Sequence, residues 1–248
     1  MHKRHIAFAA AILTIALTGS RADAEPRAVV ELFTSQGCSS CPAADKLLGE
    51  LANDPSLVTM TLAVNYWDYL GWKDTLALKG HAKRQRAYAE ARGDREVYTP
   101  QAVINGKVHV LGSDKSAIER AIAQTRGSGA LKLPVSIAVA DGKVTVRVPA
   151  AVDEHRAGEV WLCPTTGKVV VAIGSGENTG RSVTYTNVVR RWVKLGDWNG
   201  EAKEFTLPIA KLAGEDMPDK IDNVTAVVQS GAAAKPGLML GAASATLP

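Results

Sequence analysis

The sequence predicts an α/β domain followed by an all-β domain, and three observations lead to this fold class. The N-terminal part alternates apolar strand patterns with helix patterns. The C-terminal part shows only short strand patterns between Gly, Pro, Asn and Asp turns. Between them, Thr125–Pro134 ("TRGSGALKLP") has the composition of a linker. We therefore expect domains at residues 25–128 and 129–248, the second one sandwich-like.

Residues 1–24 have the pattern of a secretory signal peptide. Lys3 and Arg4 precede an apolar run, and Ala22-Asp23-Ala24 is a small-x-small cleavage site. The run is too short to span a bilayer, which takes about twenty apolar residues. We therefore expect an exported protein, periplasmic or secreted, with no membrane span after the signal is cleaved.

The charge of the chain argues against a nucleic-acid partner. The net charge is only +4, it falls further when the basic signal is removed, and no basic run with interleaved aromatic residues is present. The cysteines are more informative, because thiols of an exported protein meet an oxidising compartment in which they tend to pair. Three cysteines are an odd number, so one thiol stays free or pairs elsewhere.

The N-terminal part begins with a strand, a helix and a second strand. Ala28 to Ser35 ("AVVELFTS") is an apolar run typical of a buried strand. A helix is predicted over "PAADKLLGELAND", whose apolar residues recur at helical spacing until Asn53-Asp54-Pro55 ends it. Ser56 to Val64 is the second strand, and a helix-length crossover favours parallel pairing with the first.

The rest of this part completes a β-α-β-α-β-β-α order. An aromatic-rich segment, Tyr66–Trp72, forms either a hydrophobic lip for a polypeptide substrate or packing for the next helix or the second domain. The residues at 80–93 predict that helix, which Gly93 ends. Asn105-Gly106 predicts a hairpin over 101–111, and a last helix follows over 113–124.

The C-terminal part predicts eight short strands. They are expected at 135–139, 143–148, 159–163, 168–173, 182–193, 201–207, 224–229 and 238–242.

Cys38 and Cys41 are two residues apart at the start of the first predicted helix. The helix dipole and the unpaired N–H groups at a helix start favour a thiolate, most strongly at Cys38, while Cys41 is placed to break a mixed disulfide. A zinc site lacks further ligands at suitable spacing, and copper delivery lacks nearby Met or His ligands. A disulfide closing so short a loop is a weak staple. Dithiol chemistry is therefore favoured, with no metal.

Pro100 is the second feature with chemical meaning. It stands directly before a predicted strand, where a cis Thr99–Pro100 bond would present backbone groups to a bound chain and a trans bond would only mark an edge.

The combination of strand, C-x-x-C, helix and Thr-Pro hairpin resembles the thioredoxin fold, and "YTPQAVINGKVHVLGSD" is similar to a glutaredoxin segment. The whole chain resembles a family of secreted bacterial thioredoxin-like proteins of unknown function, through "ELFTSQGCSSCPAAD", "YWDYLGWKD", "YTPQAVING" and "GENTGRSVTYTNVV". The resemblance implies a thioredoxin-like first domain, with Cys38 as nucleophile and Cys41 as resolving thiol. It further implies that Thr99 and Pro100 form a substrate-cradling cis turn.

Three other features have alternatives that the sequence leaves open. Glu31 lies on the first strand and is either a buried proton acceptor for Cys41 or a solvated or capping carboxylate. Cys163 lies on an apolar strand, where a thiol usually behaves as a small buried hydrophobe, although a relay with the cysteine pair is an alternative. "GENTGR" at 176–181 is an interdomain contact, a ligand loop or a plain hairpin turn.

The leading functional hypothesis is an exported thiol-disulfide oxidoreductase that acts through Cys38 and Cys41 on protein or small-molecule thiols. Its partners would be a disulfide or thiol substrate and a second redox protein, and no bound cofactor is implied. The alternative is a non-catalytic binding or assembly module of the cell envelope that keeps the fold for recognition.

Overall fold

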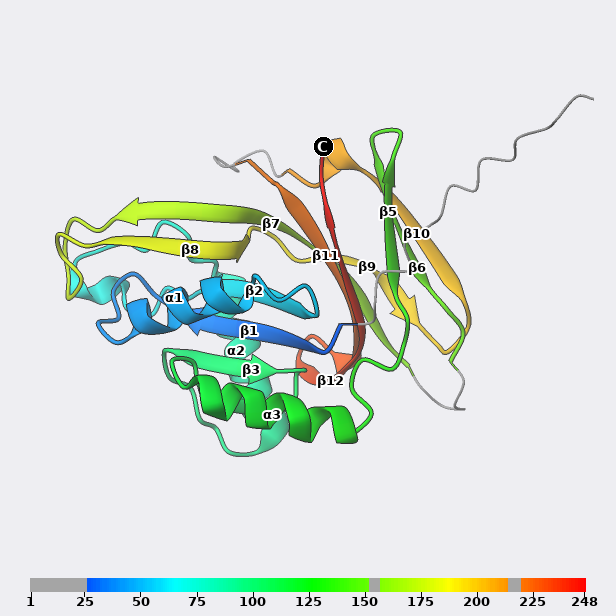
Figure 1. The fold of residues 1–248 in the computed structure, drawn as a ribbon, viewed down its shortest axis with the longest axis horizontal. Coiled ribbons are helices and arrows are strands. Elements are labelled where there is room, and N and C mark those ends of the chain that lie inside the picture. The colour runs from blue at the N-terminus through cyan, green and yellow to red at the C-terminus, as the bar shows by residue number, and fades with distance from the viewer. Residues whose placement is uncertain (1–25, 152–156, 214–219) are drawn as a thin grey trace, which may run out of the picture.

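The computed structural model describes residues 26–151, 157–213 and 220–248 (Figure 1). The predicted signal peptide lies outside these residues. Within them the chain forms a mixed α/β fold with three α-helices, a nine-stranded mixed sheet and a small three-stranded antiparallel sheet. None of the helices in the described ranges is long and apolar enough to cross a membrane.

The N-terminal part has the predicted β-α-β-α-β-β-α order. Its elements are β1 (Ala28–Thr34), α1 (Cys41–Leu51), β2 (Leu57–Ala63), α2 (Lys79–Arg92), β3 (Gln101–Ile104), β4 (Val108–Leu111) and α3 (Lys115–Gly127), with a 3-10 turn η1 (Asp68–Leu70) before α2. The central strand β1 pairs parallel with β2 and antiparallel with β3. Every residue of β1 and β2 is buried, as is typical of parallel strands covered on both faces.

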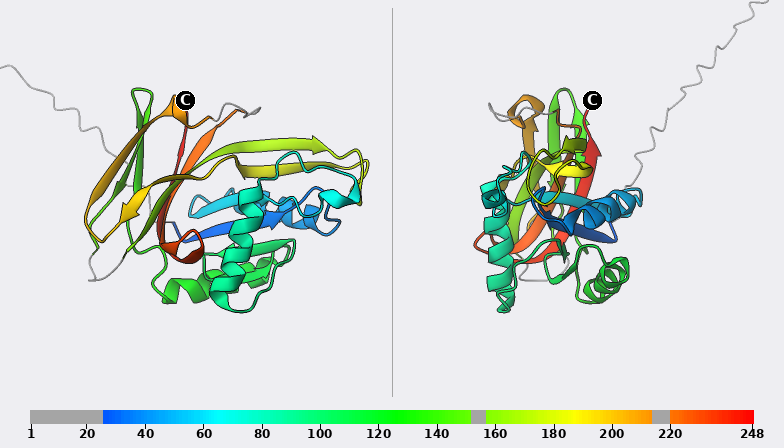
Figure 2. Two further views of the ribbon diagram at one scale, coloured as in Figure 1. Left: turned by 180° about the vertical axis from the view of Figure 1, so that it is seen from behind. Right: turned by 90° about the vertical axis from the view of Figure 1, so that its left-hand side faces the viewer.

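Helices cover both faces of this part of the sheet. Side chains alternate along β1, so Val30 packs with residues of α1 and α3, whereas Phe33 packs with Tyr88 of α2. Figure 2 shows α2 on the side of the sheet opposite to α1 and α3. The turn between β1 and α1, which carries Cys38, is therefore held at one end of a fully buried strand.

The C-terminal part is all β apart from the short 3-10 turn η2 (Ile209–Lys211) in the described residues. Its strands are β5 (Ser136–Ala140), β6 (Lys143–Val148), β7 (Gly158–Ala172), β8 (Ser182–Val189), β9 (Val193–Trp198), β10 (Lys203–Pro208), β11 (Asn223–Ala232) and β12 (Lys235–Thr246). Strands β10, β6 and β5 form the small sheet. It packs against the C-terminal strands of the large sheet through a core that includes Val146, Leu162 and Trp198.

The large sheet joins strands from both parts of the chain in the order β12-β11-β7-β8-β2-β1-β3-β4, with β9 also paired to β7. At the junction, Thr61 of β2 lies opposite Val188 of β8 in a parallel pair, and its hydroxyl donates a 2.6 Å hydrogen bond to the carbonyl oxygen of Thr186. The division into two domains at 128/129 stays a prediction. Strands from both sides of this boundary belong to one hydrogen-bonded sheet.

Two strand predictions in the C-terminal part were wrong in their bounds. The segments at 159–163 and 168–173 form one long strand, β7, because its first half pairs with β9 and β11 and its second half with β8. Of the segment predicted at 182–193, residues 182–189 form β8 and only Val193 belongs to β9, most of which was not predicted; the two strands lie one after the other along the same edge of β7. Residues 190–192 connect them.

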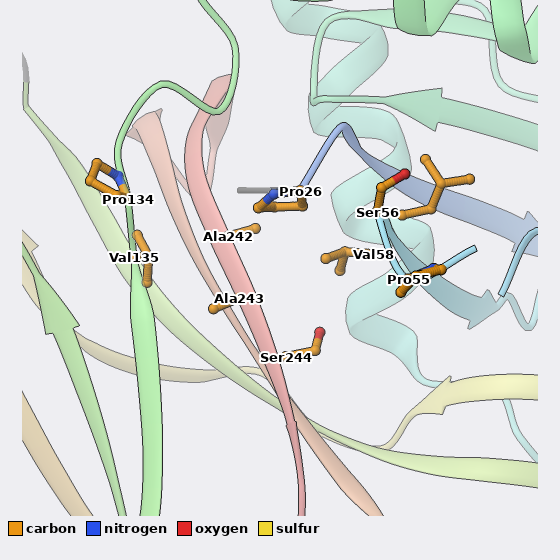
Figure 3. A pocket seen from close by; sticks show the side chains of 10 residues that line it. Pro26, Pro55, Ser56, Val58, Pro134, Val135, Ala242, Ala243 and Ser244 are labelled. Atoms are coloured by element: carbon orange, nitrogen blue, oxygen red, sulfur yellow. The ribbon is translucent and has the colours of Figure 1, made fainter. Parts of the chain in front are cut away.

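A cleft of about 310 Å³ lies where β2, β12 and the 134–135 segment approach one another (Figure 3). Its lining is mostly apolar and includes Pro26, Val58, Val135 and Ala242. The cleft adjoins the start of β2, whereas the cysteine pair follows the end of the parallel strand β1. The cysteines therefore lie at the opposite end of these strands.

Candidate functional site

The sulfur atoms of Cys38 and Cys41 lie at disulfide distance, with their Cα atoms 5.4 Å apart. Cys41 is the first residue of α1 and Pro42 follows in the first turn, where a missing N–H costs little. Cys38 and Cys41 are only 1% and 0% exposed, whereas Ser39 and Ser40 between them are exposed. The hydroxyl oxygen of Ser40 lies 3.4 Å from the sulfur of Cys38. The pair thus presents two serines to solvent and keeps its own sulfurs covered.

Asp74 holds the backbone of the cysteine turn. One carboxylate oxygen accepts a 2.8 Å hydrogen bond from the N–H of Gln36, and the other accepts one of 2.9 Å from Leu76. Asp74 is only 4% exposed, and burial is the main cause that raises its pKa above 3.8. This buried residue, in the segment between β2 and α2, therefore holds the backbone at Gln36, two residues before Cys38.

The loop between β7 and β8, residues 176–181, contacts the cysteine turn directly. The side-chain amide of Asn178 donates hydrogen bonds to the carbonyl oxygens of Gln36 (2.9 Å) and Cys38 (2.8 Å). The carboxylate of Glu177 accepts a 3.0 Å hydrogen bond from the N–H of Ser39. Asn178 is 1% exposed, so of the alternatives for "GENTGR" the structure supports a contact between distant parts of the chain.

The Thr99–Pro100 peptide bond is cis, and it lies near the cysteine turn. Trp67 connects the two features, because its indole N–H donates a 2.8 Å hydrogen bond to the Thr99 hydroxyl. Its Cβ lies so close to Gly37 that a Cβ on that glycine would approach it to 2.9 Å. The predicted residues Cys38, Cys41, Thr99 and Pro100 therefore belong to one neighbourhood.

Glu31 lies on the α2 face of β1 and is fully buried. Its carboxylate accepts a 2.7 Å hydrogen bond and ion pair from Arg84 and a 2.5 Å hydrogen bond from the Tyr88 hydroxyl. Arg84 and Tyr88 both come from α2, and Gln229 of β11 bonds to both of them. A solvated carboxylate is excluded by this burial, and a role in proton transfer stays a prediction.

Asp45 is a site residue that the sequence interpretation missed. It lies four residues after Cys41 on α1, is 1% exposed and has no ion pair among the described residues, while the nearby Thr34 hydroxyl interacts with its carboxylate. Burial raises the pKa of Asp45 well above 3.8, which outweighs the lowering effect of the Thr34 hydroxyl and is helped slightly by the charge of Asp74. The i, i+4 spacing from Cys41 in a predicted helix was the signal that could have found it.

Cys163 is a free thiol with no exposed surface, which confirms the prediction of a small buried hydrophobe. Burial raises the pKa of its thiol, so the reactive thiolate is disfavoured. Among the described residues, no cluster of three or more His, Cys, Asp or Glu side chains could hold a metal ion.

A cysteine pair at the start of a helix after a buried strand, beside a cis-proline, defines a C-x-x-C protein of mixed α/β fold. The chain belongs to a family described as "Protein of unknown function (DUF1223)", whose model matches residues 29–229. Comparison with the curated proteins gives no match.

Two solved structures are similar to most of the chain. The crystal structure of protein AGR_C_4864 from Agrobacterium tumefaciens is 33% identical, with a TM-score of 0.77 over 89% of this chain and 94% of that one. HBP35 of Porphyromonas gingivalis is 13% identical, with a TM-score of 0.57 over 90% of this chain and 76% of that one. The second likeness concerns the fold alone.

Proposed function

We propose that the protein is an exported thiol-disulfide oxidoreductase whose N-terminal part is a thioredoxin-like domain. The observation that carries this proposal is the Cys38–Cys41 pair at the start of α1, next to the cis Thr99–Pro100 bond. A helix start stabilises a thiolate, and a cis turn leaves backbone groups available to an extended chain. Its substrates would be protein or small-molecule disulfides or thiols, and a second redox protein would restore the pair.

The chemistry is a pair of thiol-disulfide exchanges. In the reducing direction, the Cys38 thiolate attacks one sulfur of a substrate disulfide, forms a mixed disulfide and releases the other substrate sulfur as a thiolate. The Cys41 thiolate then attacks the Cys38 sulfur, which closes the Cys38–Cys41 disulfide and releases the second substrate thiol. Two electrons pass from the pair to the substrate. The oxidising direction is the same sequence reversed.

The geometry favours Cys38 as the attacking group. It lies in the turn before α1, where the free N–H groups and the dipole of the helix favour negative charge. The Ser40 hydroxyl, 3.4 Å from the Cys38 sulfur, can donate a hydrogen bond to a thiolate there. Cys41 lies inside the helix and is fully covered, as suits a thiol that meets only the mixed disulfide.

Cys41 has to lose a proton before it can attack, and we assign the acceptor role to Asp45. Asp45 lies one helical turn beyond Cys41, and its raised pKa makes it a stronger base once ionised. Glu31, the acceptor predicted from the sequence, is already bound by Arg84 and Tyr88 on the other face of β1. Among the described residues Asp45 has the Thr34 hydroxyl nearby but no ion pair, so it is the better proton acceptor of the two.

One observation favours the alternative, a non-catalytic binding module. Cys38 is only 1% exposed, so a substrate disulfide reaches its sulfur only when a covering group moves aside. The loop at 176–181, which bonds to the turn at Ser39 and Cys38, is the first candidate for that movement.

The experiment that separates the two functions follows insulin reduction by the reduced protein. The parent and Cys163→Ala should both reduce insulin, because Cys163 is buried away from solvent. Cys38→Ser should be inactive, and Cys41→Ser should accumulate a mixed disulfide visible by mass spectrometry. If Cys38→Ser matches the parent, or if the parent shows no activity, the oxidoreductase proposal is wrong and the binding module is favoured.

A further inference from the structure

Trp67 and Tyr69 form an exposed aromatic surface next to the cysteine turn, which we call the aromatic shelf. We propose that the shelf binds an apolar or aromatic side chain that flanks the cysteine of a substrate, so that the substrate class is a polypeptide disulfide rather than a small-molecule one. This inference rests on the proposed oxidoreductase function and narrows its substrate.

The shelf is anchored to both parts of the site. The indole of Trp67 donates its N–H to the Thr99 hydroxyl beside the cis bond, and the Cβ of Trp67 packs against Gly37, the residue before Cys38. Tyr69 stacks on Trp67, with ring centroids 6.5 Å apart and planes at 15°. A rigid aromatic surface therefore lies within one residue of the reacting cysteine.

The ring of Tyr69 does not pack into the hydrophobic core, so core packing does not account for this aromatic residue. Its side chain is 78% exposed, while its neighbour Trp67 is partly buried against the core. A stacked ring has already lost much of its rotational freedom, so contact with another apolar group costs little further entropy. The ring is thus presented to solvent beside the indole of Trp67.

Other exposed apolar side chains lie around the same turn. The large hydrophobic residues that are exposed in the described part of the chain are Tyr69, Val97, Leu111 and Val170. Val97 lies two residues before Thr99, and Leu111 pairs with Gln101, the residue after Pro100. All but Val170 are therefore close in the chain or the sheet to the cis turn or its partner Trp67, which indicates an apolar rim around the site.

The chemistry of the site selects the occupant of this surface. A disulfide substrate brings a cysteine to Cys38, and in an extended polypeptide the residues beside that cysteine follow at roughly 3.3 Å each. The side chains of these flanking substrate residues can therefore reach the rings of Trp67 and Tyr69, which lie beside Gly37 and the cysteine turn. A small disulfide such as oxidised glutathione carries no apolar side chain to place there.

The test compares two disulfide-linked peptides that differ only in one residue beside the cysteine, Phe in one and Ser in the other, together with oxidised glutathione. The parent should reduce the Phe peptide with a kcat/KM about 3- to 10-fold higher, the range expected for one aromatic contact. Tyr69→Ala should remove this preference without changing the rate with oxidised glutathione, and Tyr69→Phe should keep it. Val170→Ala, at another exposed apolar position (67%) on β7, should behave as the parent.

Equal kcat/KM for the two peptides in the parent, or an unchanged preference in Tyr69→Ala, would overturn the inference. A parallel loss of activity toward glutathione in Tyr69→Ala would do the same, because it would show a structural effect.

Binding of the same peptides to the redox-inert Cys38→Ser/Cys41→Ser protein, measured by fluorescence anisotropy, separates this inference from the proposed function. Tighter binding of the Phe peptide that depends on Tyr69, with no disulfide reduction by the parent, would refute the oxidoreductase and keep the shelf as a binding site. Reduction of both peptides at equal rates would refute the shelf and keep the oxidoreductase.

Discussion

The side-chain amide of Asn178 donates a 2.8 Å hydrogen bond to the carbonyl oxygen of Cys38, although the two residues are 140 positions apart in the chain. A second hydrogen bond from the same amide reaches the carbonyl oxygen of Gln36. The C-terminal strands therefore hold the cysteine turn in place. This contact connects the all-β part of the chain to the chemistry proposed for its N-terminal part.

Replacing Asn178 with Ala should open the cysteine turn. The two lost hydrogen bonds shift the balance toward an exposed Cys38 by about 1.4 kcal/mol, which is roughly a ten-fold change. In the reduced protein, alkylation of Cys38 by iodoacetamide should accelerate by about that factor. Thr179→Ala, a change in the same loop at an exposed residue that bonds only to Gly176, is the matched control. An alkylation rate equal to that of the parent would show that the loop does not limit access.

Replacing Glu177 with Gln should lower the thiolate pKa of Cys38. Glu177 accepts the N–H of Ser39 and places a negative charge beside the turn, which disfavours a second negative charge on Cys38. Gln keeps an acceptor and removes the charge. Because Glu177 is exposed, the shift should be about half a pKa unit and should shrink in high salt.

The pH dependence of Cys38 alkylation measures this shift, with Glu201→Gln as an exposed control in the C-terminal part. A thiolate pKa that is unchanged or higher in Glu177→Gln would contradict the assignment.

Replacing Asp45 with Asn should stabilise the oxidised protein at alkaline pH. Its pKa is raised in the folded protein, so the folded state holds a proton that the unfolded chain releases above pH 3.8. This contribution to stability is present at low pH and is lost as the pH rises toward the folded-state pKa. Removing the charge should add about 1–3 kcal/mol to the free energy of unfolding near pH 8. Urea unfolding at two pH values measures this, and a variant less stable than the parent at both would show that the carboxyl group has a partner.

The same Asp45→Asn variant should also slow the second exchange of the catalytic cycle. Without the proton acceptor, Cys41 attacks the mixed disulfide more slowly, by about 10- to 100-fold. Formation of the mixed disulfide by Cys38 should be unaffected. Rapid quenching with mass spectrometry resolves both steps, and an equal slowing of both would mean that Asp45 acts on the fold rather than on Cys41.

His81 should make the protein less stable in mild acid. Burial lowers the pKa of His81 from 6.5 to about 4, and its Nδ1 is 2.9 Å from the carbonyl oxygen of Ala63. Below pH 6.5 the His81 side chain becomes protonated in the unfolded chain, whereas in the folded protein it stays neutral until the pH falls to about 4. Stability should fall across this window by about 3 kcal/mol.

His81→Asn should remove this slope in urea unfolding measured between neutral and mildly acidic pH. His109→Asn, at a partly exposed histidine on β4, should retain it. Stability curves of the parent and His81→Asn that run parallel across the window would contradict the buried, neutral state of His81, because any contribution from Asp45 is common to both.

Much of the N-terminal part could be predicted from the sequence because its signals are local. The apolar run of β1, the Asn105-Gly106 hairpin and the helix after Cys41 depend on residues close together in the chain. The joining of β2 to β8 could not be predicted, because strand pairing across more than a hundred residues leaves no local pattern.

In the candidate site, too, the features with local sequence signals could be predicted and those that depend on tertiary contacts could not. Cys38 and Pro100 were recognisable by residue type and position, but the partners of the turn were not. Asp74 and Asn178 are ordinary turn residues in the sequence, and only tertiary contacts reveal that they bind the turn around Cys38. For Glu31 the sequence left a buried and a solvated carboxylate open; the structure shows it buried, and its partner Arg84 lies on a helix whose register the sequence does not determine.

The reduction potential of the Cys38–Cys41 pair is the most direct test of the central claim. It can be measured in Cys163→Ala by equilibrating the protein with glutathione redox buffers and counting alkylated thiols by mass spectrometry. A redox-active pair should titrate as a single two-electron couple between about −120 and −270 mV. A disulfide that stays oxidised at potentials below about −300 mV would be a structural one, and would contradict the proposal that Cys38 and Cys41 perform disulfide exchange.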